Sequence, residues 1–173
     1  LFDQLDRVIR TGLGEDKLIV PDEVTGDYKT LEEAVLKGNW PTLGESSGKF
    51  LFILDDRGEK RDLYIRDHPS LEGRVMFVNA EPGTPEAATL IRNNPRDTEI
   101  KPLVKLGYIV RTRADADTKE ARFNDYSTFN VARESGAQII TTDYYQKSAF
   151  FDSPYHISFE DSSYLRTNPL LIK

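Results

Sequence analysis

The sequence predicts an α/β fold in which four parallel strands alternate with helices, about half of a (β/α)8 barrel. Four short apolar runs end in polar residues instead of alternating with them, which is typical of strands buried on both faces of a helix-covered parallel sheet. Helical patterns separate at least some of these runs, so successive strands form right-handed βαβ units. The chain has 173 residues, whereas a complete barrel needs about 250. We therefore expect one domain that contains half of such a barrel.

The four expected strands cover the apolar runs at 50–54, 74–79, 108–113 and 138–142. A further apolar run, too short to assign, covers 18–20. Helical spacing of apolar residues, or a capping signal, predicts helices over 2–9, 30–36, 85–91, 99–106 and 118–135. The second of these helices opens with Thr30 and has Glu33 three residues later, the spacing of a capping box. Gly107 and Gly136 are expected to end the last two helices.

The end of the chain has a different character. From Gln146 onward, aromatic and aliphatic side chains are scattered among serines and aspartates. Because these apolar side chains need burial, we expect an irregular tail packed on the barrel and not a separate domain. The alternative interpretation is a partly disordered terminus.

Composition excludes several classes of protein. The formal net charge is −6 and there is no block of basic residues, so we expect no nucleic-acid-binding face. No stretch approaches the ~18 apolar residues of a transmembrane helix, and no basic-then-apolar leader opens the chain. The absence of cysteine excludes disulfides and thiolate metal sites. The chain begins with Leu1 and not with Met, which suggests a trimmed or fragmentary beginning.

The strongest chemical signal lies at the end of the third expected strand. Period-two alternation places Arg111, Arg113 and Asp115 on one side of this strand, and its Tyr, Val, Thr and Ala residues on the other. The second side suits packing under helices, so the charged side faces the barrel axis near the rim, where active sites of this architecture lie. A planar guanidinium matches the oxygens of a phosphate. We predict that both arginines bind phosphate; the alternative is an internal Arg–Asp network that binds nothing.

Carboxylates accompany these arginines. Asp115 and Asp117 pair with the arginines, orient them or cap the next helix. The fourth expected strand repeats the plan, because Asp143 follows its apolar run and is suited to hold an arginine or a substrate hydroxyl. Asp115 and Asp143 therefore join the two arginines as candidate substrate-binding residues, and a structural role for Asp143 is equally consistent with the pattern.

Two other strand ends carry polar side chains. Asp55 and Asp56 follow the first expected strand, and hard cations such as Ca²⁺ take carboxylate oxygens as ligands. Asp55 is therefore a candidate metal ligand, with an ordinary acidic turn as the alternative. Asn79 and Glu81 lie at the end of the second expected strand and are candidates for substrate contact without a specific motif.

The two histidines, His68 and His156, do not lie at the ends of expected strands. His68 is in a segment of turn composition, and His156 is in the aromatic tail. Neither has a neighbouring motif that would make it a general base, so we interpret both as structural. No catalytic residue for phosphodiester cleavage is assigned within the chain.

Several segments resemble the Ca²⁺-dependent phosphoinositide-specific phospholipase C family, a TIM-barrel family of the glycerophosphodiester phosphodiesterase-like superfamily. Segments 107–118 and 135–144 are similar to the last two strands of that barrel, and the Arg-Thr-Arg-Ala-Asp-Ala-Asp-Thr block is specific. Segment 40–55, with its Pro-Thr-Leu and Gly-Lys pairs, resembles the entry to the fifth strand. Shorter similarities lie at 18–24, 68–77 and 166–169, although Thr167 stands where the family has Cys.

The resemblance implies that residues 1–173 are the C-terminal part of a single TIM-barrel phosphodiesterase domain. Its family cleaves phosphatidylinositol or a related glycerophosphodiester by metal-assisted acid–base catalysis, in which a histidine pair acts beside Ca²⁺. Those histidines and most metal ligands belong to the first four strands, so we expect them upstream of Leu1 and expect this chain alone to be inactive. The implied partners are the phospholipid headgroup and the N-terminal half-barrel, with at most transient membrane contact and a secreted or extracytoplasmic location.

Two other functions stay open from the residues alone. One is a non-catalytic module that binds phosphate or inositol through its arginines. The other is a structural half-barrel that dimerises, because four parallel strands leave two unpaired edges.

Overall fold

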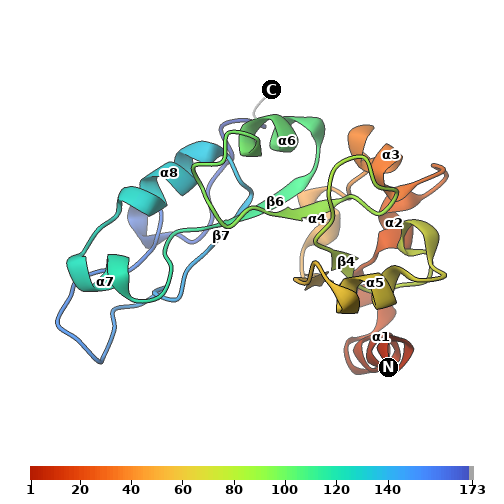
Figure 1. Cartoon of the computed structure of the whole chain (residues 1–173), viewed down its shortest axis with the longest axis horizontal. Helices are drawn as coiled ribbons and strands as arrows, with labels where there is room; N and C mark the ends of the chain where they lie inside the picture. Colours follow the sequence, from red (N-terminus) through yellow and green to blue (C-terminus); the bar gives the residue numbers. More distant parts are fainter. Residues whose placement is uncertain (172–173) are drawn as a thin grey trace. The chain divides into compact units, whose positions relative to one another are not determined.

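The computed structural model describes residues 1–171 and contains helices and parallel strands, as predicted (Figure 1). The strands are β1 (Leu18–Ile19), β2 (Phe50–Leu51), β3 (Ile53–Leu54), β4 (Phe77–Val78), β5 (Thr89–Ile91), β6 (Ile109–Arg113) and β7 (Ile139–Thr141). The helices are α1 (Phe2–Leu13), α2 (Pro21–Thr25), α3 (Leu31–Leu36), α4 (Leu43–Ser46), α5 (Glu59–Ile65), α6 (Ile100–Leu106), α7 (Lys119–Phe123) and α8 (Ser127–Ser135). Short 3₁₀ turns cover Glu15–Lys17, Pro69–Leu71 and Glu160–Ser162. No helix within residues 1–171 has the length and apolar character that crossing a membrane requires.

The strand pairs β1–β2, β3–β4 and β6–β7 are all parallel. The register aligns Ile53 with Phe77 in the second pair and Arg111 with Ile139 in the third. A single parallel bridge between Asn79 and Thr89 follows β4. Parallel pairing with helices in the connections confirms the predicted α/β class.

The chain divides into two compact units. Unit 1 comprises Leu1–Leu90 and Leu106–Tyr108, and unit 2 comprises Ile91–Lys105 and Ile109–Lys173. Strands β1 to β4 belong to unit 1, and β6 and β7 belong to unit 2. The single domain expected from the sequence stays a prediction.

Three expected elements differ from the structure. The strand expected at 50–54 is divided into β2, which pairs with β1, and β3, which pairs with β4. The helix expected at 85–91 is wrong, because Thr89–Ile91 forms β5. Thr89 and Leu90 are fully buried, and the Thr89 hydroxyl donates to the Val78 carbonyl at 2.7 Å, so tertiary contacts override the local helical signal. The helix expected at 118–135 is divided into α7 and α8, because Asn124 adopts a left-handed conformation with φ 52°.

Local signals determine the start of α3 in unit 1 and the residue that follows α6. The Thr30 side chain accepts from the Glu33 backbone N–H at 3.1 Å, as the capping-box spacing predicted for α3. Gly107 follows α6 with φ 106°, and a Cβ at this position would lie 2.6 Å from the Val35 carbonyl oxygen. Only glycine fits this approach, in which both Gly107 and Val35 belong to unit 1.

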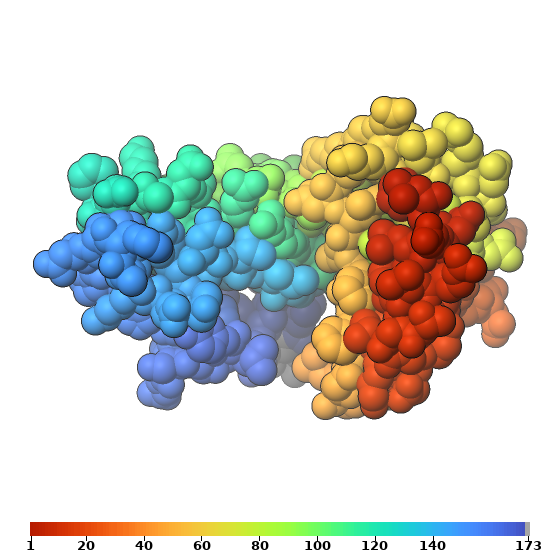
Figure 2. Space-filling model, turned by 90° about the horizontal axis from the view of Figure 1, so that it is seen from below, coloured from red at the N-terminus to blue at the C-terminus, as the bar shows by residue number. Residues whose placement is uncertain are grey.

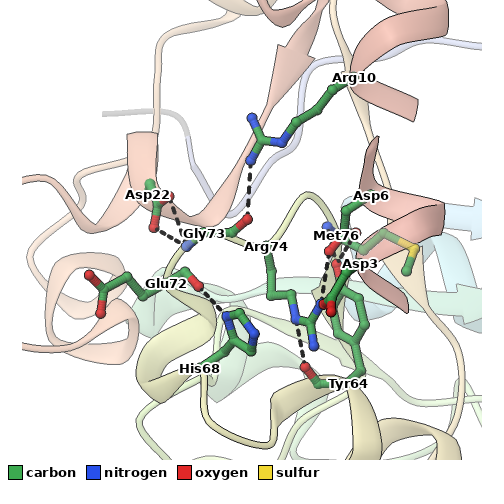
Figure 3. Close-up of polar contacts among 10 residues, drawn as sticks. All are labelled: Asp3, Asp6, Arg10, Asp22, Tyr64, His68, Glu72, Gly73, Arg74 and Met76. Atoms are coloured by element: carbon green, nitrogen blue, oxygen red, sulfur yellow. Dashed lines mark hydrogen bonds and ion pairs between the residues drawn. The ribbon is translucent and has the colours of Figure 1, made fainter. Parts of the chain in front are cut away.

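A buried polar network fastens α1 to the rest of unit 1 (Figure 3). Arg74 donates to the carboxylates of Asp3 at 2.6 Å and Asp6 at 3.1 Å, and its Nε donates to the Tyr64 carbonyl at 2.8 Å. The Tyr64 hydroxyl donates to Asp6 and accepts from the Met76 backbone, both at 2.8 Å. The hydrogen bond from Arg74 lowers the pKa of the Asp3 carboxyl. Arg74 and Tyr64 therefore link α1 to the segments around Tyr64 and Met76.

The core of unit 2 includes the end of the chain. Tyr155 and Ile157 are buried in one cluster with Ala114, Ala121 and Phe129. The residues around them have no regular secondary structure until the turn Glu160–Ser162. The expectation of an irregular, packed tail is confirmed in part: Tyr155 packs against other aromatic rings of unit 2, whereas Phe150 and Tyr164 are exposed.

Candidate functional site

Strand β6 presents Arg111 and Arg113 on one face of unit 2. Val110, before the first arginine, and Thr112, between the two, are fully buried, whereas both arginines are half-buried. This alternation is the one expected from the sequence. Pairing with β7 sets Arg113 directly opposite Thr141, so two strands support the face that carries the guanidinium groups.

Asn93 lies between the two arginines. Its Oδ1 accepts from Arg113 Nε at 2.8 Å and also from Arg111 Nη1. An amide oxygen carries no net charge, so this contact orients the two guanidinium groups without neutralising them. Two fixed cations that converge on one oxygen form an arrangement that suits an anion with several oxygens.

Asp115 is a hydrogen-bonding centre at the end of β6. It is buried, and its Oδ2 accepts from the hydroxyls of Thr142 and of Tyr155, the latter at 3.2 Å. Its Oδ1 accepts from the Asp143 backbone N–H at 3.2 Å. Burial, and then the neighbouring Asp115 carboxylate, raises the pKa of Tyr155, so the phenol keeps its proton and remains a donor. Asp115 therefore holds the segment after β7 against the end of β6.

These side chains surround a hollow of about 310 Å³ within unit 2. Eight residues line it: Arg111, Arg113, Asp115, Ala116, Asp117, Thr141, Thr142 and Asp143. Arg111 lies in the middle of β6, and the other seven residues end or follow β6 and β7, at the carboxyl ends where ligands bind in parallel sheets. The four predicted substrate-binding residues are thus brought together, although their role stays a prediction.

The lining has mixed charge. Two guanidinium groups lie beside Asp117 and Asp143, which are exposed, and beside the buried Asp115. Arginines bind phosphate oxygens, whereas carboxylates accept hydrogen bonds from hydroxyl groups. The pocket is therefore suited to a ligand that has both a phosphate and free hydroxyls.

The remaining predicted residues lie outside this pocket. His68 Nδ1 lies 2.7 Å from the Glu72 carbonyl in unit 1, and His156 Nδ1 lies 3.1 Å from the Pro154 carbonyl in unit 2. Both contacts are local, as expected of structural histidines. Asn79 is buried after β4, and Glu81 forms an ion pair with Arg57 at 3.3 Å.

The residues that the structure describes do not by themselves fit a calcium ion. Ca²⁺ takes six to eight oxygen ligands, and residues 1–171 contain no group of three or more His, Cys, Asp or Glu side chains that could hold a metal. Asp55 is exposed after β3. The adjacent Asp56 accepts from the backbone N–H of Gly58 and Arg61, which lowers its pKa. Asp55 as a metal ligand stays a prediction, and no chemical step is derived through calcium.

Asn93 is the site residue that the sequence did not reveal. It follows β5, where a helix was expected, so its position beside the strand β6 was hidden. The sequence does contain the pattern seen at the other strand ends, a short apolar run followed by polar residues. Here the run Thr89–Ile91 is followed by Arg-Asn-Asn-Pro.

Comparison with known proteins gives a consistent result. Residues 1–169 match the profile of the family described as phosphoinositide phospholipase C, Ca²⁺-dependent. A solved structure of a Ca²⁺-dependent phosphatidylinositol-specific phospholipase C enzyme from Streptomyces antibioticus has a similar fold, with a TM-score of 0.59 and 18% sequence identity. The similarity covers 83% of this chain and 58% of that one. No curated protein matches the sequence.

Proposed function

Because the chain belongs to the Ca²⁺-dependent phosphoinositide phospholipase C family, we propose that it supplies the headgroup-binding part of a phosphodiesterase. The proposed substrate is phosphatidylinositol or a related glycerophosphodiester. The observation that carries this proposal is the convergence of Arg111 and Arg113 on Asn93 at the edge of the pocket. We infer the class of reaction from the family, and the chemical groups of the ligand from the residues that line the pocket.

In the proposed complex, each residue has a distinct role. The guanidinium groups of Arg111 and Arg113 donate hydrogen bonds to the phosphate oxygens and balance their negative charge. Asp143 and Asp117 accept hydrogen bonds from hydroxyls of the inositol ring. Asp115 is a positioning residue, because its oxygens are already used by Thr142, Tyr155 and the Asp143 backbone.

Cleavage of the ester also needs an acid–base pair. His68 and His156 make local backbone contacts and do not line the pocket. The proposal therefore assigns proton transfer, and the calcium site of the full enzyme, to residues outside this chain. On this proposal the 173-residue chain binds the headgroup and does not cleave the lipid.

Titration calorimetry with myo-inositol 1-phosphate tests the binding step. Arg111→Ala is expected to weaken binding by about ten- to a hundredfold, because a charge-assisted hydrogen bond contributes about 1.5–3 kcal/mol. Arg96→Ala is the control, since Arg96 is exposed in unit 2 and lies outside the pocket lining. Equal affinities of the wild type and Arg111→Ala would contradict the proposed role of Arg111.

A second assay tests whether this chain binds the headgroup without cleaving the lipid. We expect no release of inositol phosphate from phosphatidylinositol vesicles by this chain with Ca²⁺. Turnover clearly above the blank would show that the acid–base pair lies within these 173 residues.

A further inference from the structure

A second hollow lies in unit 1 and has no part in the proposed function. Its volume is about 460 Å³, within the range of about 300–1,000 Å³ that is typical of small-molecule sites. It shares no residue with the pocket at the ends of β6 and β7. In Figure 2 the residues around β1 and those around β2, the strands next to this hollow in sequence, lie side by side on the surface of unit 1. Six residues line the hollow, here called the Trp40 pocket: Glu23, Asn39, Trp40, Pro41, Glu45 and Lys49.

Trp40 and Pro41 form the apolar part of this lining. The Trp40 indole N–H donates to the Gly107 carbonyl at 2.9 Å, and the indole packs on Phe77 with ring centres 5.4 Å apart. Both Trp40 and Pro41 are half-buried, so these contacts fix an indole that is still partly open to a ligand. A side chain that is fixed before binding loses little conformational freedom when a ligand packs on it.

The polar side chains of the lining are also held in place. Glu45 Oε2 accepts from the Thr42 backbone N–H at 2.8 Å and from the Thr42 hydroxyl at 2.7 Å. Asn39 Nδ2 donates to the Val24 carbonyl at 2.8 Å. Each contact uses only part of what a carboxylate or an amide can donate and accept, so both side chains keep further hydrogen-bonding capacity. The polar groups of the Trp40 pocket are therefore positioned before any ligand binds.

The charges around the Trp40 pocket nearly cancel. Lys49 Nζ lies 3.0 Å from Glu23 Oε1, so these two lining charges form an ion pair. The hydrogen bonds from Thr42 lower the pKa of the Glu45 carboxyl, which keeps it ionised and an acceptor at neutral pH. An ion of either sign therefore meets little net opposite charge, whereas a neutral ligand that both donates and accepts hydrogen bonds finds partners of both kinds. The segments 22–24 and 37–49, which carry the lining, contain three carboxylates and two ammonium groups: Asp22, Glu23, Glu45, Lys37 and Lys49.

We propose that the Trp40 pocket binds a neutral hexopyranose ring, free or at the end of a glycan. The C–H groups of the sugar ring pack on the indole and prolyl rings. The sugar hydroxyls donate to the Glu45 carboxylate and the Asn39 amide oxygen, and they accept from the Lys49 ammonium group. A quaternary ammonium ion fits less well, because the lining has one aromatic residue and Glu23 is already paired with Lys49. The proposal does not rest on the proposed function, since the two pockets share no residue.

Titration of the whole chain with methyl β-D-glucopyranoside tests the proposal, because Trp40 is the one tryptophan of the sequence and its fluorescence reports on this pocket. We expect a saturable change in emission with a Kd on the order of 1 mM, as for a small neutral ligand in an open hollow. Lys49→Gln removes a donor to the sugar hydroxyls and should raise this Kd about tenfold. Lys37→Gln is the matched control, because it removes the same charge from an exposed residue of unit 1 outside the lining. Its Kd should equal that of the wild type.

Two further measurements separate this proposal from the proposed function. Arg111→Ala should bind the glucoside with the wild-type Kd, whatever its effect on inositol phosphate; a weaker Kd would place the sugar in the other pocket and refute the proposal. Lys49→Gln should keep the wild-type Tm, which shows that it is folded.

Three results of the titration would overturn the sugar site. The first is an unchanged Trp40 emission at about ten times the expected Kd. The second is a wild-type Kd for Lys49→Gln. The third is tighter binding of choline chloride than of the glucoside, because the pocket would then recognise a cation.

Discussion

Replacement of Arg74 by Met should destabilise unit 1 by about 3 kcal/mol. The side chains of Arg74 and Asp6 are only 5% and 8% exposed, and they form an ion pair at 3.1 Å. Removing one partner of a buried ion pair costs about 3–5 kcal/mol, because the other charge stays buried without compensation. We expect the lower end of this range, since the Asp6 carboxylate keeps the hydrogen bond from the Tyr64 hydroxyl. This loss is a large share of the ~5–15 kcal/mol that stabilises a typical domain.

Urea unfolding followed by the fluorescence of Trp40 measures this loss. Trp40 is the one tryptophan of the chain and packs on Phe77 in unit 1, with ring centres 5.4 Å apart. The double variant Arg74→Met, Asp6→Asn should recover about 2 kcal/mol, because no buried charge is left unpaired. Arg57→Met is the control, since its ion pair with Glu81 is 55% exposed on each side and contributes less than about 1 kcal/mol. The reasoning is refuted if Arg74→Met costs no more than Arg57→Met, or if Asp6→Asn does not rescue it.

Two further predictions concern the residues around the pocket and the core. Thr112 is fully buried and its hydroxyl has no hydrogen-bond partner within residues 1–171, so Thr112→Val should raise the free energy of unfolding by about 1 kcal/mol. Thr89→Val removes the hydrogen bond to the Val78 carbonyl and should lower the free energy of unfolding by a similar amount, measured in the same urea titration. Equal changes in the free energy of unfolding of the two variants would contradict this reasoning. The raised pKa of Tyr155 stabilises the fold below pH ~10, and this contribution is lost as the pH rises further. Tyr155→Phe should therefore reduce the fall of Tm above pH ~10, and an unchanged fall would show that the tyrosine does not ionise on unfolding.

The face of β6 could be read from the sequence because alternation alone determines it. A strand buried on one side by Val110 and Thr112 must turn Arg111 and Arg113 to the other side. Asp143 was placed by its position directly after the apolar run of the next strand, since alternation does not distinguish the two faces of that strand. Side chains of a strand alternate between its two faces with a period of two residues, so such features can be predicted without knowing which distant residues pack nearby.

Other features depend on contacts between residues far apart in sequence. Asp115 is held by Tyr155, 40 residues later, and this contact has no local signal. Asn93 reaches the arginines because the residues before it form β5, although a helix was predicted for 85–91. The break between α7 and α8 at Asn124 also depends on tertiary contacts, since asparagine tolerates the left-handed conformation but does not require it.

The proposed phosphate site depends on two arginines, so the affinity of myo-inositol 1-phosphate for the double variant Arg111→Gln, Arg113→Gln is the decisive measurement. Both side chains contact Asn93 and line the same pocket. We predict that each single variant weakens binding by about tenfold or more, and that the double variant shows no measurable binding. Wild-type affinity in the double variant, with an unchanged Tm, would contradict the assignment of this pocket to the phosphate of the headgroup.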